Sequence, residues 1–281
     1  MLYGNIVSGF ALQSYHKAEE GLVYAASHGY NYWYIDGSLH SDFFDQWTED
    51  RIKKLKAKCE EYNIKPIYHG NFKVPISSDV EVLRLCAVEY VKKEIDLAAM
   101  LNCNLIIHGG AIVEPRKSVV VKKMALNNLI KSLKTLKRYA DDKGVIIWLE
   151  NLSHYPDYKP FSYVGTTLEE LTFIQSKIKI PLFLDFGHAN VNAVNSVLLF
   201  FTALHTNIAG VSISNNNGKL DQHLRLENGT IDYSTIVKTM FALGWNGMVA
   251  FENRNTNPTA SIQGLYALID SVVRKENLKV V

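Results

Sequence analysis

The stretch LNNLIKSLKTLKRYADDKGVIIWLE, residues 126–150, contains one full unit of the fold that this sequence predicts. Between Leu126 and Ala140, apolar residues recur at steps of three or four, which is typical of the buried face of a helix. Gly144 is suited to end that helix in the left-handed conformation. An apolar run, residues 145–149, comes next and is followed directly by Glu150. The stretch therefore predicts a helix, a tight turn and a buried strand with a carboxylate at its end.

Apolar runs of the same kind alternate with longer amphipathic segments along the whole chain. Gly29 and Gly244 stand before the second and the last of these runs, in the place that Gly144 takes before the fifth. Such an alternation is expected when parallel strands are joined by crossover helices. The eight predicted strands are residues 2–7, 30–35, 65–68, 104–107, 145–149, 181–184, 208–213 and 247–251.

We predict an α/β fold, a (β/α)8 TIM barrel that forms a single domain over residues 1–281. The predicted strands are continuously apolar, which fits burial on both faces inside a ring of helices. The length of 281 residues is close to the roughly 250 that such a barrel needs. A doubly wound open sheet is the alternative. Against it, the sequence has no GxGxxG after its first strand and no Walker loop, and its polar residues are spread over many strand ends.

Composition and charge narrow the functional classes. The formal net charge is +2, and Lys and Arg gather on predicted helices such as residues 122–137, so we expect no nucleic-acid-binding surface. No apolar stretch of 18 residues occurs and no cationic segment opens the chain, so neither membrane insertion nor secretion is expected. Cys59, Cys86 and Cys103 are widely spaced and form no CxxC pair, which predicts buried, reduced thiols and a cytoplasmic location.

Several predicted strands are followed directly by a His, an Asp or a Glu. In a barrel, the C-terminal strand ends build the active site, so these side chains should meet in one axial pocket. One such residue alone would be explained as a hydrogen-bonded structural group. Several acids buried together need a cation or protons to neutralise them, and a metal is the simplest explanation. The residues are His69, His108, Glu150, Asp185 and Glu252.

Two polar segments add further candidate ligands. His188 lies three residues after Asp185, and Asp221 and His223 lie two residues apart in a polar loop. Mixed nitrogen and oxygen ligands suit Mn, Zn, Co or Fe better than Ca, and Mg fits where carboxylates dominate. The sequence therefore predicts a divalent metal ion and leaves its identity open. The aromatic residues near these segments, which we expect mainly in the core, are Phe72, Trp148 and Phe186.

In these segments the sequence resembles the xylose isomerase-like barrels. This family includes sugar and sugar-phosphate isomerases and epimerases, together with the endonuclease IV type of apurinic-site nuclease. The resemblance extends over nearly the whole chain. Its most specific segments are WLEN (residues 148–151), LDFGH (184–188), NNGKLDQH (216–223), NGTID (228–232) and FEN (251–253).

The two branches of this family imply different uses of the same residues. In the isomerases and epimerases, the resemblance implies that Glu150, Asp185 and Glu252 bind the metal with a His from the seventh strand. The two glutamates also exchange protons with the substrate there. In the nuclease branch it implies a cluster of three metals, held by His69, His108, Glu150, Asp185, His188, Asp221, His223 and Glu252.

The sequence departs from the family pattern around its seventh strand. Ser212 stands where the family usually has the His ligand, Asn215 where it often has Asp, and Glu227 where it generally has Gly. A hydroxyl is a poorer ligand than an imidazole, so the central metal site of either branch is weakened. We expect His223, water or substrate to supply the missing bond.

These observations predict a divalent-metal-dependent isomerase or epimerase that acts on a sugar or a related hydroxy-carbonyl compound. Glu150 and Glu252 would transfer the proton through an enediolate. The metal would be held by Glu150, Asp185, His223 and Glu252, with Asp221 as a further ligand. The residues expected to bind substrate are His69, His108 and His188.

Three alternatives stay open at this point. The first is an endonuclease IV-like phosphodiesterase that acts on abasic DNA, although the weak basic field argues against it. The second is a metal-dependent dehydratase or lyase of the same fold, which shares the enediolate step. The third is a non-catalytic barrel with a degraded metal site. The resemblance also implies a homodimer, since barrels of this family often pair.

Overall fold

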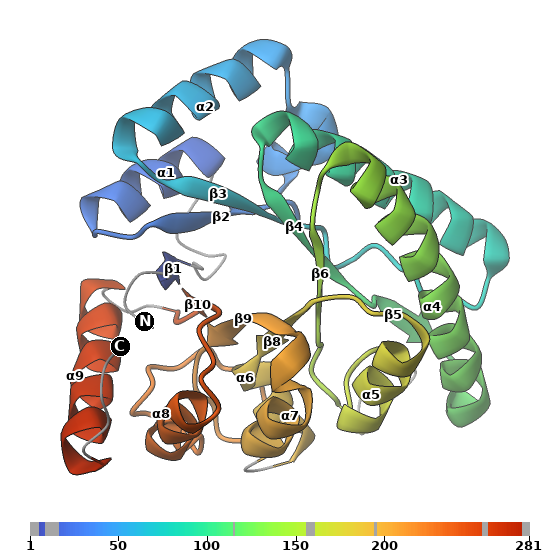
Figure 1. Cartoon of the computed structure of the whole chain (residues 1–281). Helices are drawn as coiled ribbons and strands as arrows, with labels where there is room; N and C mark the ends of the chain where they lie inside the picture. The colour runs from blue at the N-terminus through green and yellow to red at the C-terminus, as the bar shows by residue number, and fades with distance from the viewer. Residues whose placement is uncertain are drawn as a thin grey trace.

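The barrel strands of this chain close into a ring. The computed structural model describes residues 6–8, 17–114, 116–155, 161–193, 196–254 and 258–276. Parallel strands follow one another in the order β1-β10-β9-β8-β6-β4-β3-β2, and β1 pairs with both β2 and β10, which closes the barrel (Figure 1). Their bounds are β1 (Ile6–Ser8), β2 (Tyr32–Asp36), β3 (Lys65–His69), β4 (Asn104–His108), β6 (Ile147–Glu150), β8 (Leu182–Asp185), β9 (Ile208–Ile213) and β10 (Met248–Phe251). The predicted (β/α)8 barrel is confirmed, and the open-sheet alternative is wrong.

Helices connect the barrel strands, and most of them lie around the outside of the barrel (Figure 1). They are α1 (Ala18–Ser27), α2 (Glu49–Tyr62), α3 (Glu81–Leu101), α4 (Ser118–Lys143), α5 (Leu168–Lys177), α6 (Phe186–Asn192), α7 (Ser196–Leu204), α8 (Tyr233–Ala242) and α9 (Pro258–Glu276), with short 3-10 helices η2 (His40–Asp42), η3 (Phe44–Gln46) and η4 (His205–Asn207). Side chains of Thr48, Thr167 and Asp232 accept a hydrogen bond from the first turns of α2, α5 and α8. These caps satisfy N–H groups that have no partner inside the helix.

The turns that lead from helix to strand use left-handed residues. The φ angles of Gly29, Gly144 and Gly244 are 79°, 70° and 64°, as predicted for residues that end a helix. A Cβ at any of the three would meet nothing within 4 Å, so the requirement is conformational and not steric crowding. Asn63 and Asn102 take the same conformation after α2 and α3, with φ angles of 53° and 54°. Asparagine tolerates this region, which made these two turns harder to recognise from the sequence.

Side chains on the barrel strands alternate between the barrel interior and the layer beneath the helices, as the period of two in a strand requires. The interior cluster consists of Tyr34, Ile67, Ile106, Trp148, Phe183 and Ala250. Two positions further along the same segments stand Asp36, His69, His108, Glu150, Asp185 and Glu252. The same parity directs this second set inward. A polar layer therefore lies on the apolar interior at the C-terminal ends of the strands.

The loops after two barrel strands contain structure that the sequence did not predict. β5 (Ala111–Val113) and β7 (Phe161–Tyr163) pair as a small antiparallel sheet, in the segments that follow β4 and β6. Both α6 and α7 lie between β8 and β9, where one crossover helix was expected. These additions all lie in the connections that leave the C-terminal ends of strands.

Two expectations from composition are tested by the structure. Cys59 and Cys103 are buried, but Cys86 is exposed on α3, so its predicted burial was wrong. All three thiols are free. In the part of the chain that the structure describes, no helix is both long enough and apolar enough to cross a membrane.

Candidate active site

A cavity of about 190 Å³ lies at the C-terminal ends of the barrel strands. It is lined by most of the residues that the sequence singled out: His69, His108, Glu150, His188, Asp221, His223 and Glu252. Asp185 lies directly beside them, with Oδ1 3.6 Å from Nδ1 of His188. The structure therefore brings together every predicted site residue. The other lining residues are Phe72, Leu152, Ser153, Tyr155, Tyr163 and Arg254.

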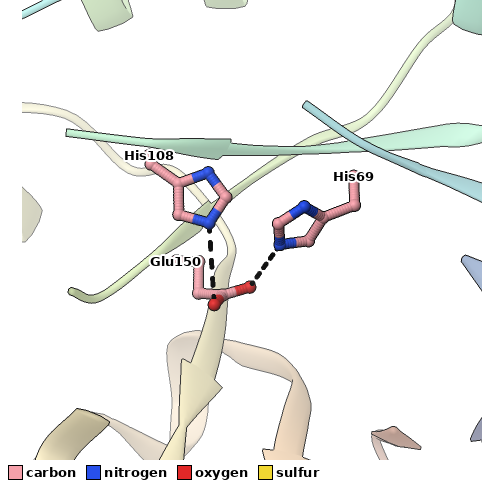
Figure 2. Close-up of side chains that lie close together, drawn as sticks. All are labelled: His69, His108 and Glu150. Carbon is pink, nitrogen blue, oxygen red and sulfur yellow. Dashed lines mark ion pairs between the residues drawn. The ribbon is translucent and has the colours of Figure 1, made fainter. Parts of the chain in front are cut away.

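Three residues at the ends of β3, β4 and β6 form one side of the cavity, which we call the strand wall: His69, His108 and Glu150 (Figure 2). Nε2 of His69 lies 3.7 Å from Oε2 of Glu150, and Nε2 of His108 lies 3.6 Å from Oε1. These separations are too long for hydrogen bonds. They are close to the roughly 3.4 Å between two ligand atoms that share one tetrahedral ion at about 2.1 Å. Oε2 of Glu150 is buried without a hydrogen-bond partner. The strand wall therefore fits a divalent cation.

The charges of the strand wall stabilise one another. Burial alone would raise the pKa of Glu150, but the neighbouring His108 and His69 hold that pKa well below its usual range. Burial would lower the pKa of His69, but the Glu150 carboxylate outweighs it and raises the pKa to about 9. Burial lowers the pKa of His108. Because a metal ligand must be a neutral imidazole, a cation at this wall would compete with the proton on His69.

A second part of the cavity, which we call the loop wall, is formed by His188 of α6 and by Asp221 and His223 of the loop after β9. Oδ2 of Asp221 lies 3.3 Å from Nε2 of His188 and 2.7 Å from Nε2 of His223. Nδ1 of His188 donates to the carbonyl of Asn151, and Nδ1 of His223 to that of Glu252, each at 2.8 Å. Such bonds orient histidines that bind metals. Both Nε2 atoms are thereby directed toward one carboxylate.

Buried carboxylates dominate the electrostatics of the whole site. Burial would raise the pKa of Asp221, but His188 and His223 hold it well below its usual range. Burial raises the pKa of Asp185 to about 7, and neighbouring carboxylates add to the shift. Burial and then the charge of Glu150 raise the pKa of Glu252 to about 7. Four acids in one cavity cannot all ionise without positive charge beside them, which is the condition that a cation would meet.

The segments 148–151 and 184–188 are joined by their own hydrogen bonds. The Asn151 amide accepts from the backbone N–H of Asp185 at 2.7 Å and donates to its carbonyl at 3.0 Å. Asp185 also caps α6, because its Oδ1 accepts from the backbone N–H of His188. Its Oδ2 is buried without a hydrogen-bond partner and is therefore free for a cation. The two segments thus fix Glu150, Asp185 and His188 relative to one another.

The departure at Asn215 has a structural reason. Asn215 is fully buried, and its Nδ2 donates to the carbonyl of Leu226 at 2.5 Å. Its Oδ1 accepts from the backbone N–H of Ile231 at 3.0 Å. An ionised Asp could not donate to the Leu226 carbonyl, so the amide is required by this loop. The other departure, Glu227, pairs with Arg225 at 2.7 Å on the surface.

Ser212 of β9 bonds to a glutamate of the site. Its side chain is fully buried, and its hydroxyl donates to Oε1 of Glu252 at 2.8 Å. Tyr34 of β2 approaches the same region: burial raises its pKa well above the usual range, and the charges of Glu252 and Glu150 add to the shift. Its ring stacks on His69 at a centroid distance of 5.6 Å. Tyr34 was not predicted as a site residue, because a tyrosine inside an apolar strand is also typical of a core residue.

The aromatic residues near the site have different roles. Trp148 packs inside the barrel against Phe183 at a centroid distance of 5.4 Å, and Phe186 lies in the outer core beside Phe201. The expected core role is confirmed for these two. Phe72 instead lines the cavity, so for it the expectation was wrong. Further lining residues that the sequence analysis missed are Ser153, Tyr155, Tyr163 and Arg254, none of which directly follows an apolar run.

Comparison with known proteins agrees with this fold. The chain is 26% identical over 227 residues to an uncharacterized protein of Methanocaldococcus jannaschii, which covers 74% of this chain and 84% of that protein. It resembles the crystal structure of a D-tagatose 3-epimerase-like protein with a TM-score of 0.82 and 22% identity, over 98% of this chain and 100% of that one. It also resembles an L-ribulose 3-epimerase with a TM-score of 0.76 and 17% identity, over 99% and 98% of the two chains. At these identities the structural likeness shows the fold. The family model described as xylose isomerase-like TIM barrel matches residues 22–271, and the chain belongs to this family.

Proposed function

We propose that this protein is a divalent-metal-dependent isomerase or epimerase that acts on a sugar or a related hydroxy-carbonyl compound. The observation that carries the proposal is that Glu150 and Glu252 line one cavity together with four histidines. Two carboxyl groups at one site are what a reaction needs when it removes a proton from carbon and returns one to it. The epimerase names of the similar solved structures support a sugar as the substrate.

The metal would be centred on Glu150. This residue belongs to two groups of ligand atoms that lie within 4.8 Å of one another, one with His69 and His108 and the other with Asp185 and His188. A divalent ion there would supply positive charge beside the carbonyl and hydroxyl oxygens of a bound substrate. The geometry favours His69 and His108 as ligands over a role in substrate binding alone. Nε2 of His223 points toward Asp221, which favours pairing with Asp221 over a role as a ligand of the metal at Glu150.

The proton transfer would be carried by the two glutamates. One carboxylate removes the proton from the carbon next to the carbonyl, and the other carboxyl group returns a proton, with an enediolate between the two steps. Ser212 donates to Oε1 of Glu252 and thereby fixes this group, which leaves Oε2 for the transfer. His188 is held by the Asn151 carbonyl, so its Nε2 can orient a substrate hydroxyl.

The test is solvent exchange. Protein loaded with Zn or Mn is incubated in deuterated water with a panel of ketohexoses and ketopentoses, and the products are analysed by NMR. We expect deuterium on the carbon next to the carbonyl, and no conversion by Glu252→Gln. Conversion without deuterium would indicate a hydride shift and remove both glutamates from acid–base catalysis. Loss of water would assign the protein to the dehydratases.

The loop wall favours a second candidate, a metal-dependent phosphodiesterase. Asp221 with two oriented histidines offers a further cation site, and clustered cations can activate water and neutralise a phosphate. Binding to a duplex with an abasic site, measured at increasing salt, tests this candidate. Tight, salt-sensitive binding with strand cleavage would favour it over the isomerase.

A further inference from the structure

Arg254 lines the active-site cavity and has no ion-pair partner among the residues that the structure describes. It follows β10, two residues after Glu252, and lines the cavity. Its backbone N–H donates to the carbonyl of His223 at 2.8 Å, which fixes its main chain against the loop wall. Its Nε is buried and has no hydrogen-bond partner. Among the described residues that line this cavity, it is the sole Lys or Arg.

Other arginines with limited exposure in this chain are satisfied by acceptors. Arg51 binds Glu19 and Asp42, with distances of 2.7 and 2.5 Å. Arg84 binds Glu81 at 2.6 Å. Arg254 makes no ion pair with any carboxylate in the described ranges, although several carboxylates share its cavity. A guanidinium is always charged, and a buried donor without an acceptor costs free energy.

We propose that Arg254 binds an oxyanionic substituent of the substrate, a phosphate or a carboxylate. This inference rests on the proposed function, because it names the class of hydroxy-carbonyl compound that the site accepts. The planar guanidinium offers parallel N–H donors that match the two oxygens of either group. A neutral sugar would leave Nε unpaired. An anionic substrate supplies the missing acceptor.

A role in simple charge balance is the alternative for Arg254. In that role the side chain offsets the charges of Glu150, Asp185, Asp221 and Glu252 and touches no ligand. Its loss would then lower the affinity of the metal-loaded protein for charged and neutral ligands alike. A recognition role predicts a selective loss for anionic ligands. The two roles are separated by ligands that share a carbon skeleton and differ in the anionic group that they carry.

The experiment uses three ligands with the same three-carbon skeleton. Glycerol has no anionic group, glycerate has a carboxylate, and glycerol phosphate has a phosphate. Affinities are measured by calorimetry on the zinc-loaded protein and on its Arg254→Gln and Arg254→Lys variants. We expect Arg254→Gln to lower the affinity for one or both anionic ligands by about tenfold or more and to leave the affinity for glycerol unchanged. Arg254→Lys should recover part of the lost affinity, because lysine keeps the charge but lacks the parallel N–H donors of the guanidinium. The anion that loses more identifies the substituent.

Arg138→Gln is the matched control, because Arg138 is exposed on α4 far from the cavity lining and its loss removes the same charge. It should bind all three ligands like the parent. Equal weakening of glycerol, or no change in either anion, would overturn the proposal. Metal content is measured in every sample. If the solvent-exchange test fails while Arg254→Gln still loses anion binding selectively, the proposed reaction is wrong and the anion site stands.

Discussion

The strand wall and the loop wall present the same kinds of side chain to one cavity but are built by different means. His108 and Glu150 are ladder partners on β4 and β6, and His69 pairs with Ile106, so the strand wall is fixed by the barrel itself. The loop wall depends on bonds from its imidazoles to backbone carbonyls. Strand register fixes where a residue lies, and a bond to Nδ1 fixes how its ring is turned. The two walls therefore need different support.

The Nδ1 atoms of the four imidazoles show this difference. Nδ1 of His69 and Nδ1 of His108 are buried without a hydrogen-bond partner, while His188 and His223 use theirs. In the strand wall, Glu150 and the proposed cation would therefore contribute to the orientation of the rings, together with the stacking of Tyr34 on His69.

Glu150→Gln should be the most damaging change. Glu150 is the shared group of the strand wall and a proposed proton carrier, so we expect turnover to fall by about 10⁴-fold or more and bound metal to be lost. The fold should remain, because the side chain lies above the apolar interior. Steady-state kinetics, metal analysis and circular dichroism measure the three quantities. Retention of both metal and turnover would show that the strand wall is not the centre of the site.

Glu252→Gln should reduce turnover by about 10²- to 10³-fold and leave most of the metal in place. Glu252 lies outside both ligand groups that include Glu150, so its proposed role is proton transfer. Ser212 can still donate to the amide oxygen, which keeps the side chain oriented. The comparison with Glu150→Gln in the same metal analysis is the control. Equal loss of metal in both variants would place Glu252 among the ligands.

Ser212→His should tighten the binding of Zn by about tenfold, because an imidazole is a better ligand for this ion than a hydroxyl or water. Turnover need not rise, because the change also removes the hydrogen bond to Glu252. Ser212→Ala is the matched control, since it loses the same bond and adds no ligand. Competition with a chelator measures the affinities. Equal affinities for the parent and Ser212→His would show that an imidazole on β9 does not reach the metal.

How much could be predicted from the sequence differs between the two walls. The residues of the strand wall were predicted to meet in one pocket, because each directly follows an apolar run and strand period fixes its direction. The loop wall residues were predicted as candidate ligands from their spacing and from the family resemblance. Their arrangement could not be predicted, since it depends on long-range bonds such as that of His223 to the Glu252 carbonyl. Arg254 was missed, because nothing in its local sequence separates a residue that lines the cavity from a surface arginine.

Glu94 of α3 gives the smallest expected effect on turnover, and it tests the support behind the strand wall. It is 1% exposed, and its Oε1 accepts from the backbone N–H of Asn71, just after His69. Burial raises its pKa to about 8 from an ordinary value of 4.5, against the opposing effects of the Asn71 N–H and His69. The unfolded chain therefore releases this proton near pH 4.5, while the folded protein keeps it until about pH 8. Because the folded protein holds this proton more tightly than the unfolded chain, protonation of Glu94 contributes to the free energy of unfolding. The contribution is complete below pH 4.5 and is lost as the pH rises to about 8.

Glu94→Gln should remove that pH dependence. The amide keeps an acceptor for Asn71 and does not ionise, so turnover should change by less than about threefold. At about 1.4 kcal/mol per pKa unit, the free energy of unfolding of the parent should fall by a few kcal/mol relative to that of the variant between pH 5 and pH 8. Urea unfolding of metal-free protein at both pH values measures the gain, with the exposed Glu60→Gln on α2 as the control. Parallel pH profiles for parent and variant would mean that Glu94 is ionised in the folded protein. The strand wall would then hold a further negative charge behind His69, which would favour a cation in front of it even more strongly.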